Sequence, residues 1–106
     1  MLASDVRRVR SVGEVIRELE GPIDGGFIVR VYGSSSQGRW RAWLEFISLQ
    51  HGNLSRSAVA RTFPDREALA AWALGLGDDD IRAALEDAEL VAARDLGRIP
   101  AEEARV

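Results

Sequence analysis

Residues Phe27–Phe63 read FIVRVYGSSSQGRWRAWLEFISLQHGNLSRSAVARTF, and this stretch decides the fold class. Side chains alternate along it as they do in strands, where successive residues point to opposite faces of a sheet. Two turn-forming runs, GSSSQG and QHGN, divide the stretch into three segments. We therefore expect an antiparallel sheet with strands at Phe27–Tyr32, Arg39–Leu49 and Leu54–Phe63.

The alternation sorts these residues into two faces. The more apolar face is assigned to the core and carries Phe27, Val29, Val31, Trp40, Ala42, Leu44 and Phe46. The opposite face interleaves aromatic rings with arginines, and its expected partner-binding residues are Arg30, Tyr32, Arg41, Trp43 and Arg61. Rings beside arginines are typical of protein-interaction hot spots and of modules that stack bases. Plain cross-strand packing explains the same residues equally well.

Helical patterns flank the strands. Ser11-Val12-Gly13-Glu14 matches a capping box, which predicts a helix that ends at Gly21-Pro22. Asp65 is the expected N-cap of a second helix, and Asp78 that of a third, which ends near Gly97 and Pro100. The expected order is α-β-β-β-α-α, an α+β fold whose helices pack on one face of a three-stranded antiparallel sheet.

Length and composition set the broad class. The chain has 106 residues, which predicts one domain over 1–106 with a frayed tail from about residue 101. Cys is absent, which excludes disulfides and thiolate chemistry. No apolar run approaches the ~20 residues of a membrane span, and the first residues lack the apolar core of a signal peptide. We expect a cytoplasmic protein that does not contact a membrane.

Charge is distributed unevenly along the chain. All 14 basic residues are Arg, a usage typical of a GC-rich bacterial genome. Residues 1–66 carry ten Arg and seven acids, whereas residues 67–106 carry four Arg and ten acids, which gives the net charge of −3. This balance does not favour nucleic acid as a partner, although it leaves a basic half available.

The remaining polar clusters have simple structural explanations. Asp78-Asp79-Asp80 stands at a helix start, where carboxylates favour the dipole, and lacks the alternate spacing of an oxygen-ligand loop. His51 lies in a turn, without the nucleophile or orienting carboxylate that catalysis requires. The run Gly33–Gly38 lacks the Lys-Ser/Thr end of a phosphate loop. We expect no catalytic, cofactor-binding or metal-binding residues.

Two segments carry a resemblance. GRWRAWLEF at Gly38–Phe46, followed by TFPDREALAAWA at Thr62–Ala73, resembles a group of small uncharacterised bacterial proteins over about residues 27–90. The resemblance implies a fold and no activity. The helix–three strands–helix order also looks like a double-stranded RNA-binding domain, whose second helix begins with a basic run. Here that helix begins DREALAAW, at Asp65–Trp72, so the resemblance does not extend to the binding residues.

Two functional hypotheses follow. The first is a non-enzymatic protein-binding or adaptor module that uses its open sheet face or an acidic C-terminal helix to bind a protein partner or a second copy of itself. The alternative is a small regulatory nucleic-acid-binding protein of antitoxin type. Its phosphate-binding residues would be Arg7, Arg8, Arg10, Arg30, Arg41 and Arg61.

Salt dependence separates these hypotheses. Because the chain carries a net charge of −3, we expect no useful affinity for duplex DNA or RNA near physiological salt. Fluorescence anisotropy with labelled duplexes measures this. Specific submicromolar binding that weakens steeply with added salt would favour the antitoxin-type hypothesis instead.

Overall fold

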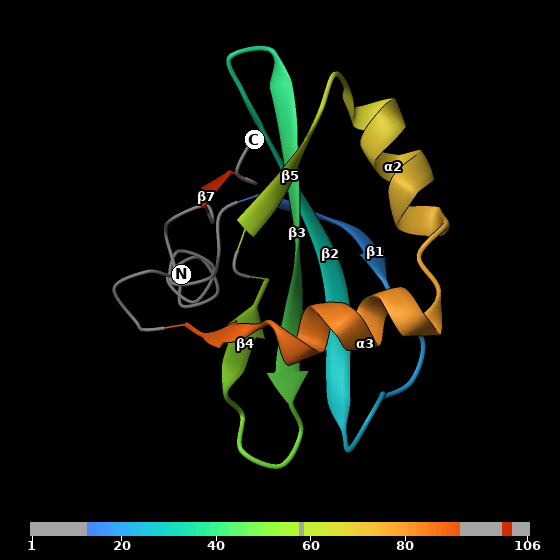
Figure 1. Ribbon diagram of the computed structural model, residues 1–106, viewed down its shortest axis with the longest axis vertical. Coiled ribbons are helices and arrows are strands. Elements are labelled where there is room, and N and C mark those ends of the chain that lie inside the picture. Colours follow the sequence, from blue (N-terminus) through green and yellow to red (C-terminus); the bar gives the residue numbers. More distant parts are fainter. Residues whose placement is uncertain (1–12, 58, 92–100, 103–106) are drawn as a thin grey trace, which may run out of the picture.

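The computed structural model describes residues 13–57, 59–91 and 101–102. It is an α+β fold in which two helices pack on one face of a mostly antiparallel sheet (Figure 1). The strands are β1 (Glu14–Glu18), β2 (Phe27–Ser36), β3 (Arg39–Ser48), β4 (Leu54–Arg56), β5 (Val59–Phe63), β6 (Glu89–Leu90) and β7 (Ala101–Glu102). The helices are α2 (Arg66–Leu74) and α3 (Asp78–Glu86).

The sheet is larger than the three strands expected, and the order of elements differs. Its main path is β1-β2-β3-β4-β6, and β5 pairs with the same edge of β3 as β4 does. Strands β1 to β6 pair antiparallel, whereas β7 pairs parallel with β5. The α+β class and the antiparallel sheet are confirmed, whereas the α-β-β-β-α-α order is wrong.

The first element is a strand where a helix was expected. Ser11 and Val12 of the predicted capping box lie outside the described residues, and Gly13 has a φ of 102°, which is not helical. Glu14 pairs with Gly33, and its carboxylate accepts hydrogen bonds from Arg66 at the start of α2. Pairing with the edge of β2 overrides the local helical signals here, since propensity is a weak prior against tertiary contacts.

The β2–β3 hairpin is longer and tighter than expected. The segment Gly33–Ser36 belongs to β2, so only Gln37 and Gly38 form the turn, with φ values of 54° and 77°. Two residues with positive φ make a type I′ turn, which matches the twist of the strands. Gly33 is needed within the strand because a Cβ there would lie 2.9 Å from Leu69 Cδ1 of α2.

The third predicted strand is broken in two. Between β4 and β5, Ser57 bonds Leu44 of β3: its Oγ accepts from the Leu44 N–H at 2.8 Å, and its own N–H donates to the Leu44 carbonyl at 3.0 Å. The break therefore leaves the facing backbone of β3 satisfied. The two pieces do not form an edge of the sheet, because β4 also pairs with β6 and β5 with β7.

The helices match the sequence signals at their starts better than at their ends. Asp65 caps α2 as expected, its Oδ1 accepting the Ala68 N–H at 2.8 Å. Helix α3 has Gly77 as N-cap, so Asp78 is its first residue rather than its cap. It ends at Glu86 and gives way to β6, far short of the predicted end at 97–100, which lies outside the described residues.

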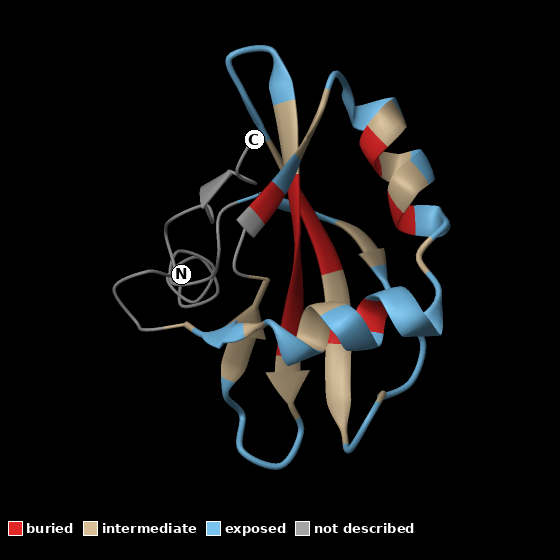
Figure 2. Cartoon of the chain, viewed as in Figure 1, coloured by how far each residue is buried: buried red, intermediate tan, exposed pale blue. Residues whose placement is uncertain are grey.

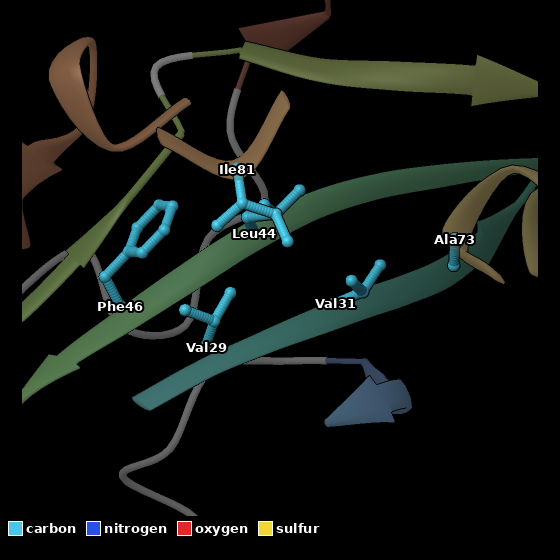
Figure 3. Packing of buried hydrophobic residues seen from close by; sticks show 6 residues of the cluster. All are labelled: Val29, Val31, Leu44, Phe46, Ala73 and Ile81. Atoms are coloured by element: carbon cyan, nitrogen blue, oxygen red, sulfur yellow. The ribbon is translucent and has the colours of Figure 1, made fainter. Parts of the chain in front are cut away.

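The main core lies between the sheet and the helices. Figure 3 shows four strand side chains, Val29 and Val31 from β2 and Leu44 and Phe46 from β3, on the side of the sheet that faces Ala73 of α2 and Ile81 of α3. All six are buried, and Figure 2 shows that the buried parts of β2 and β3 lie in the middle of these strands. This arrangement confirms the core face chosen from the alternation, except that Phe27 and Trp40 are only half-buried.

The entry into β1 depends on glycine at position 13. A Cβ there would lie 2.7 Å from the Gly33 carbonyl oxygen, and its φ of 102° strains any L-residue. We expect Gly13→Ala to lower the free energy of unfolding by about 3 kcal/mol or more. Urea denaturation measures the loss.

Gly52→Ala is the matched control. Gly52 also has a positive φ, of 71°, but a Cβ there would meet nothing within 4 Å. It should therefore cost only the ~1–2 kcal/mol of the left-handed backbone. Equal losses for the two variants would show that Gly13 is not in close contact with β2.

Candidate functional site

The structure brings together four of the five residues expected to bind a partner. Arg30 and Tyr32 of β2 share the face opposite the helices with Arg41 and Trp43 of β3. Arg61 does not join them, because it pairs with Ala42, whose side of the sheet is the helix face. The assignment of Arg61 was wrong because a one-residue change of register turns every side chain of a strand over, and the sequence does not show the register of β5.

The two aromatic residues of this group form a second, smaller core. Trp43 and Tyr32 stack with their ring centroids 6.0 Å apart and their planes within 10°. They are only 1% and 6% exposed, and Ala60 of β5 is buried beside them. Both rings are therefore packed in a core of the chain itself rather than exposed on this face.

A row of alternating charges crosses the same face. Successive pairings across β1, β2, β3, β4 and β6 align Glu18, Arg30, Glu45, Arg56 and Glu89. Opposite charges on directly paired residues stabilise adjacent strands. The signs alternate at every step, so the row favours this register over any other.

Glu45 at the centre of the row is 3% exposed, and its Oε2 accepts a hydrogen bond from Trp43 Nε1 at 3.0 Å. Arg30 donates to Glu18 at 3.1 Å. Burial lowers the pKa of Arg30, but hydrogen bonds to Tyr32 and Glu18 and the charge of Glu18 outweigh it, so the pKa ends above its usual value. These side chains are thus part of the sheet's own polar network, which matches the cross-strand packing alternative.

A concave surface lies on the other side of the sheet, beside the helices. A groove of about 470 Å³ runs between α2, α3, β3 and β5. Its lining is mostly apolar and comes from four elements and the segments that join them. The lining residues are Ala42, Trp43, Leu44, Ser57, Arg61, Trp72, Gly75, Leu76, Asp80, Ala83 and Ala84.

The wall of the groove on the α2 side is built around Trp72. Its ring lies 5.3 Å from the ring of Phe63, and the Arg61 guanidinium carbon lies 5.5 Å from the Trp72 centroid. An Arg over an indole ring is a favourable cation–π arrangement. Small residues on the facing elements, Ala83, Ala84 and Gly75, leave the space open. The groove was not predicted from the sequence, because its walls come from elements far apart along the chain.

A second hollow of about 320 Å³ lies between the β1–β2 connection and the start of α3. Its charged residues are Glu20, Asp24, Asp78 and Arg82, and Arg82 lies 3.7 Å from Asp24. Within the part of the chain that the structure describes, no group of three or more His, Asp or Glu side chains could hold a metal ion.

The other polar candidates are placed as follows. Asp80 Oδ2 accepts the Gly77 N–H at 3.0 Å, so it acts at the start of α3. His51 is exposed in the turn before β4. Arg7, Arg8 and Arg10 lie outside the described residues.

Comparison with known proteins does not extend the assignment. No family model, no curated protein and no solved structure matches this chain. Among the described residues, no helix is long and apolar enough to cross a membrane. Function must therefore be argued from the surfaces described above.

The buried position of Glu45 makes it more important to stability than the exposed acid of the same row. We expect Glu45→Ala to cost about 3 kcal/mol, since it leaves the buried Trp43 N–H without its acceptor. Glu18→Ala should cost less than about 1 kcal/mol, because the Glu18 side chain is 53% exposed. Thermal and urea unfolding measure both losses. Similar small effects would mean that Glu45 is solvated.

Proposed function

We propose that this protein is a non-enzymatic binding module that takes an apolar segment of a protein partner into the groove between α2 and α3. The observation that carries the proposal is the lining of that groove, where an aromatic ring and small aliphatic side chains surround a few polar groups. Such concave, mostly apolar surfaces are typical of binding sites.

The composition of one wall supports a protein partner. Trp and Arg dominate the binding energy of protein interfaces, particularly where they sit in a pocket surrounded by other contacts. Here Trp72 and Arg61 lie together on the groove, and Trp72 is half-buried against Phe63. A partner side chain that enters the groove would contact the exposed part of this ring and remove it from water.

The groove is also held in place before any partner binds. Helix α2 is tied to β1 at both ends: Arg66 donates to Glu14 Oε2 at 2.6 Å, and Arg17 donates to the Ala73 carbonyl at 2.7 Å. The second bond satisfies a carbonyl at the C-terminal end of a helix that has no basic residue in its own last turn. Pre-organised walls lower the entropy that binding must overcome.

The geometry favours the groove over the surfaces proposed from sequence. Self-association through the sheet depended on an exposed Trp43, which is buried. The nucleic-acid alternative needs its arginines to converge. Arg30 and Arg41 share one face, whereas Arg61 lies on the other, so these three arginines do not line a single surface.

The decisive experiment fills the groove. Ala83 is exposed and lines it, so Ala83→Arg should abolish partner binding while the fold is retained. Partners captured from the source cell are purified, and their affinity for the wild-type protein and the variant is compared by calorimetry, with circular dichroism as the check on folding.

Ala71→Arg is the matched control. It places the same side chain at an exposed position of α2 that does not line the groove. It should leave binding unchanged. A purified partner that binds the Ala83→Arg protein as tightly as the wild type would contradict the proposal.

A further inference from the structure

We infer that the segment which enters the groove is basic as well as apolar, with Lys or Arg side chains on either side of its apolar residues. The inference rests on the proposed function and specifies the chemistry of its partner. It is carried by the exposed carboxylates around Ala83 on α3, one of which, Asp80, lines the groove.

Helix geometry places these carboxylates. Ala83 lines the groove, and residues three and four positions away on a helix lie on the same side as it does. The four positions that lie three and four residues before and after Ala83 all carry exposed acids, which are Asp79, Asp80, Glu86 and Asp87.

The excess of negative charge extends beyond this side of the helix. Between residues 78 and 90 the acids are Asp78, Asp79, Asp80, Glu86, Asp87 and Glu89, and the single basic residue is Arg82. Arg82 lines the other hollow, where it faces Asp24. Across the groove, Arg61 supplies one positive charge against the four carboxylates around Ala83.

Glu86 and Asp87, at the C-terminal end of α3, are unfavourable for the stability of the helix itself. Carboxylates at a helix N-terminus stabilise it, which accounts for Asp79 and Asp80, but at the C-terminus they oppose the dipole. Glu86 ends α3 and Asp87 is its C-cap, with no basic residue in the last turn. In the described part of the chain neither side chain has an ion pair. A cationic partner would offset this repulsion.

Complementary charge also selects between classes of partner. A basic amphipathic segment places its apolar side chains on Trp72 and Leu76 and its cations beside the α3 carboxylates. A nucleic acid would bring phosphates to the same carboxylates and be repelled.

The test uses two synthetic amphipathic helical peptides with the same leucine positions, one with lysine and one with glutamate at every polar position. Calorimetry measures their binding to the wild-type protein and to Ala83→Arg. It also measures binding to the double variant Asp79→Asn/Glu86→Gln and to the control Glu20→Gln/Glu67→Gln, which neutralises two exposed carboxylates outside α3.

We expect only the lysine peptide to bind the wild-type protein, with an affinity that falls about five- to tenfold in Asp79→Asn/Glu86→Gln and falls further with added salt. The control double variant should bind as the wild type does, and Ala83→Arg should not bind.

Other outcomes separate the two proposals. If both peptides bind equally and Ala83→Arg abolishes both, the groove is a binding site but the inferred basic chemistry is wrong. If the lysine peptide binds Ala83→Arg as well as the wild type, the groove proposal itself fails. Failure of the lysine peptide to bind at all, or tighter binding of a single-stranded RNA oligonucleotide, would also overturn the inference.

Discussion

The ten-residue ladder between β2 and β3 is the constraint on which the rest of the structure depends. The two-residue turn at Gln37-Gly38 sets its register, and from Phe27↔Ser48 to Ser36↔Arg39 every pair follows without a bulge. This register decides at once that Val29, Val31, Leu44 and Phe46 face the helices, and that Tyr32, Trp43 and Glu45 face the other way. The remaining strands then add to a hairpin whose two faces are already fixed.

Strand β3 is the most central strand of this arrangement, because both of its faces are buried. Leu44 and Phe46 lie in the helix-covered core, whereas Trp43 and Glu45 lie in the second core, where the indole N–H binds the carboxylate. A buried carboxylate is costly unless its charge is balanced, and the register sets arginines on both neighbouring strands opposite it. Arg30 and Trp43, which were expected from the sequence to bind a partner, thus form interactions that stabilise the register of β3 with its neighbours.

The sequence predicted the structural features that depend on residues close together in the chain. The Asp65 cap of α2 and the apolar face of β2 and β3 could be predicted, because each depends on neighbours in the sequence or on strict alternation. The strand at 14–18 and the face of Arg61 could not, since both depend on which strand pairs with which, and in what register. The groove escaped for the same reason: Arg61, Trp72 and Ala83 come from three elements that only the tertiary fold brings together.

The two faces of the sheet therefore differ in what they leave for binding. On the face opposite the helices, Tyr32 and Trp43 are buried and Arg30 is bonded within the sheet, so a partner would have to compete with interactions that stabilise the fold. On the helix face, Ser57 satisfies the backbone of β3 at the break, and α2 is bonded to β1, so the β3 and α2 walls of the groove are held by contacts within the chain. A surface that binds without disturbing the core has to be of the second kind. Helix geometry places the carboxylates at the end of α3, Glu86 and Asp87, beside that groove, and within the described residues neither of them forms an ion pair.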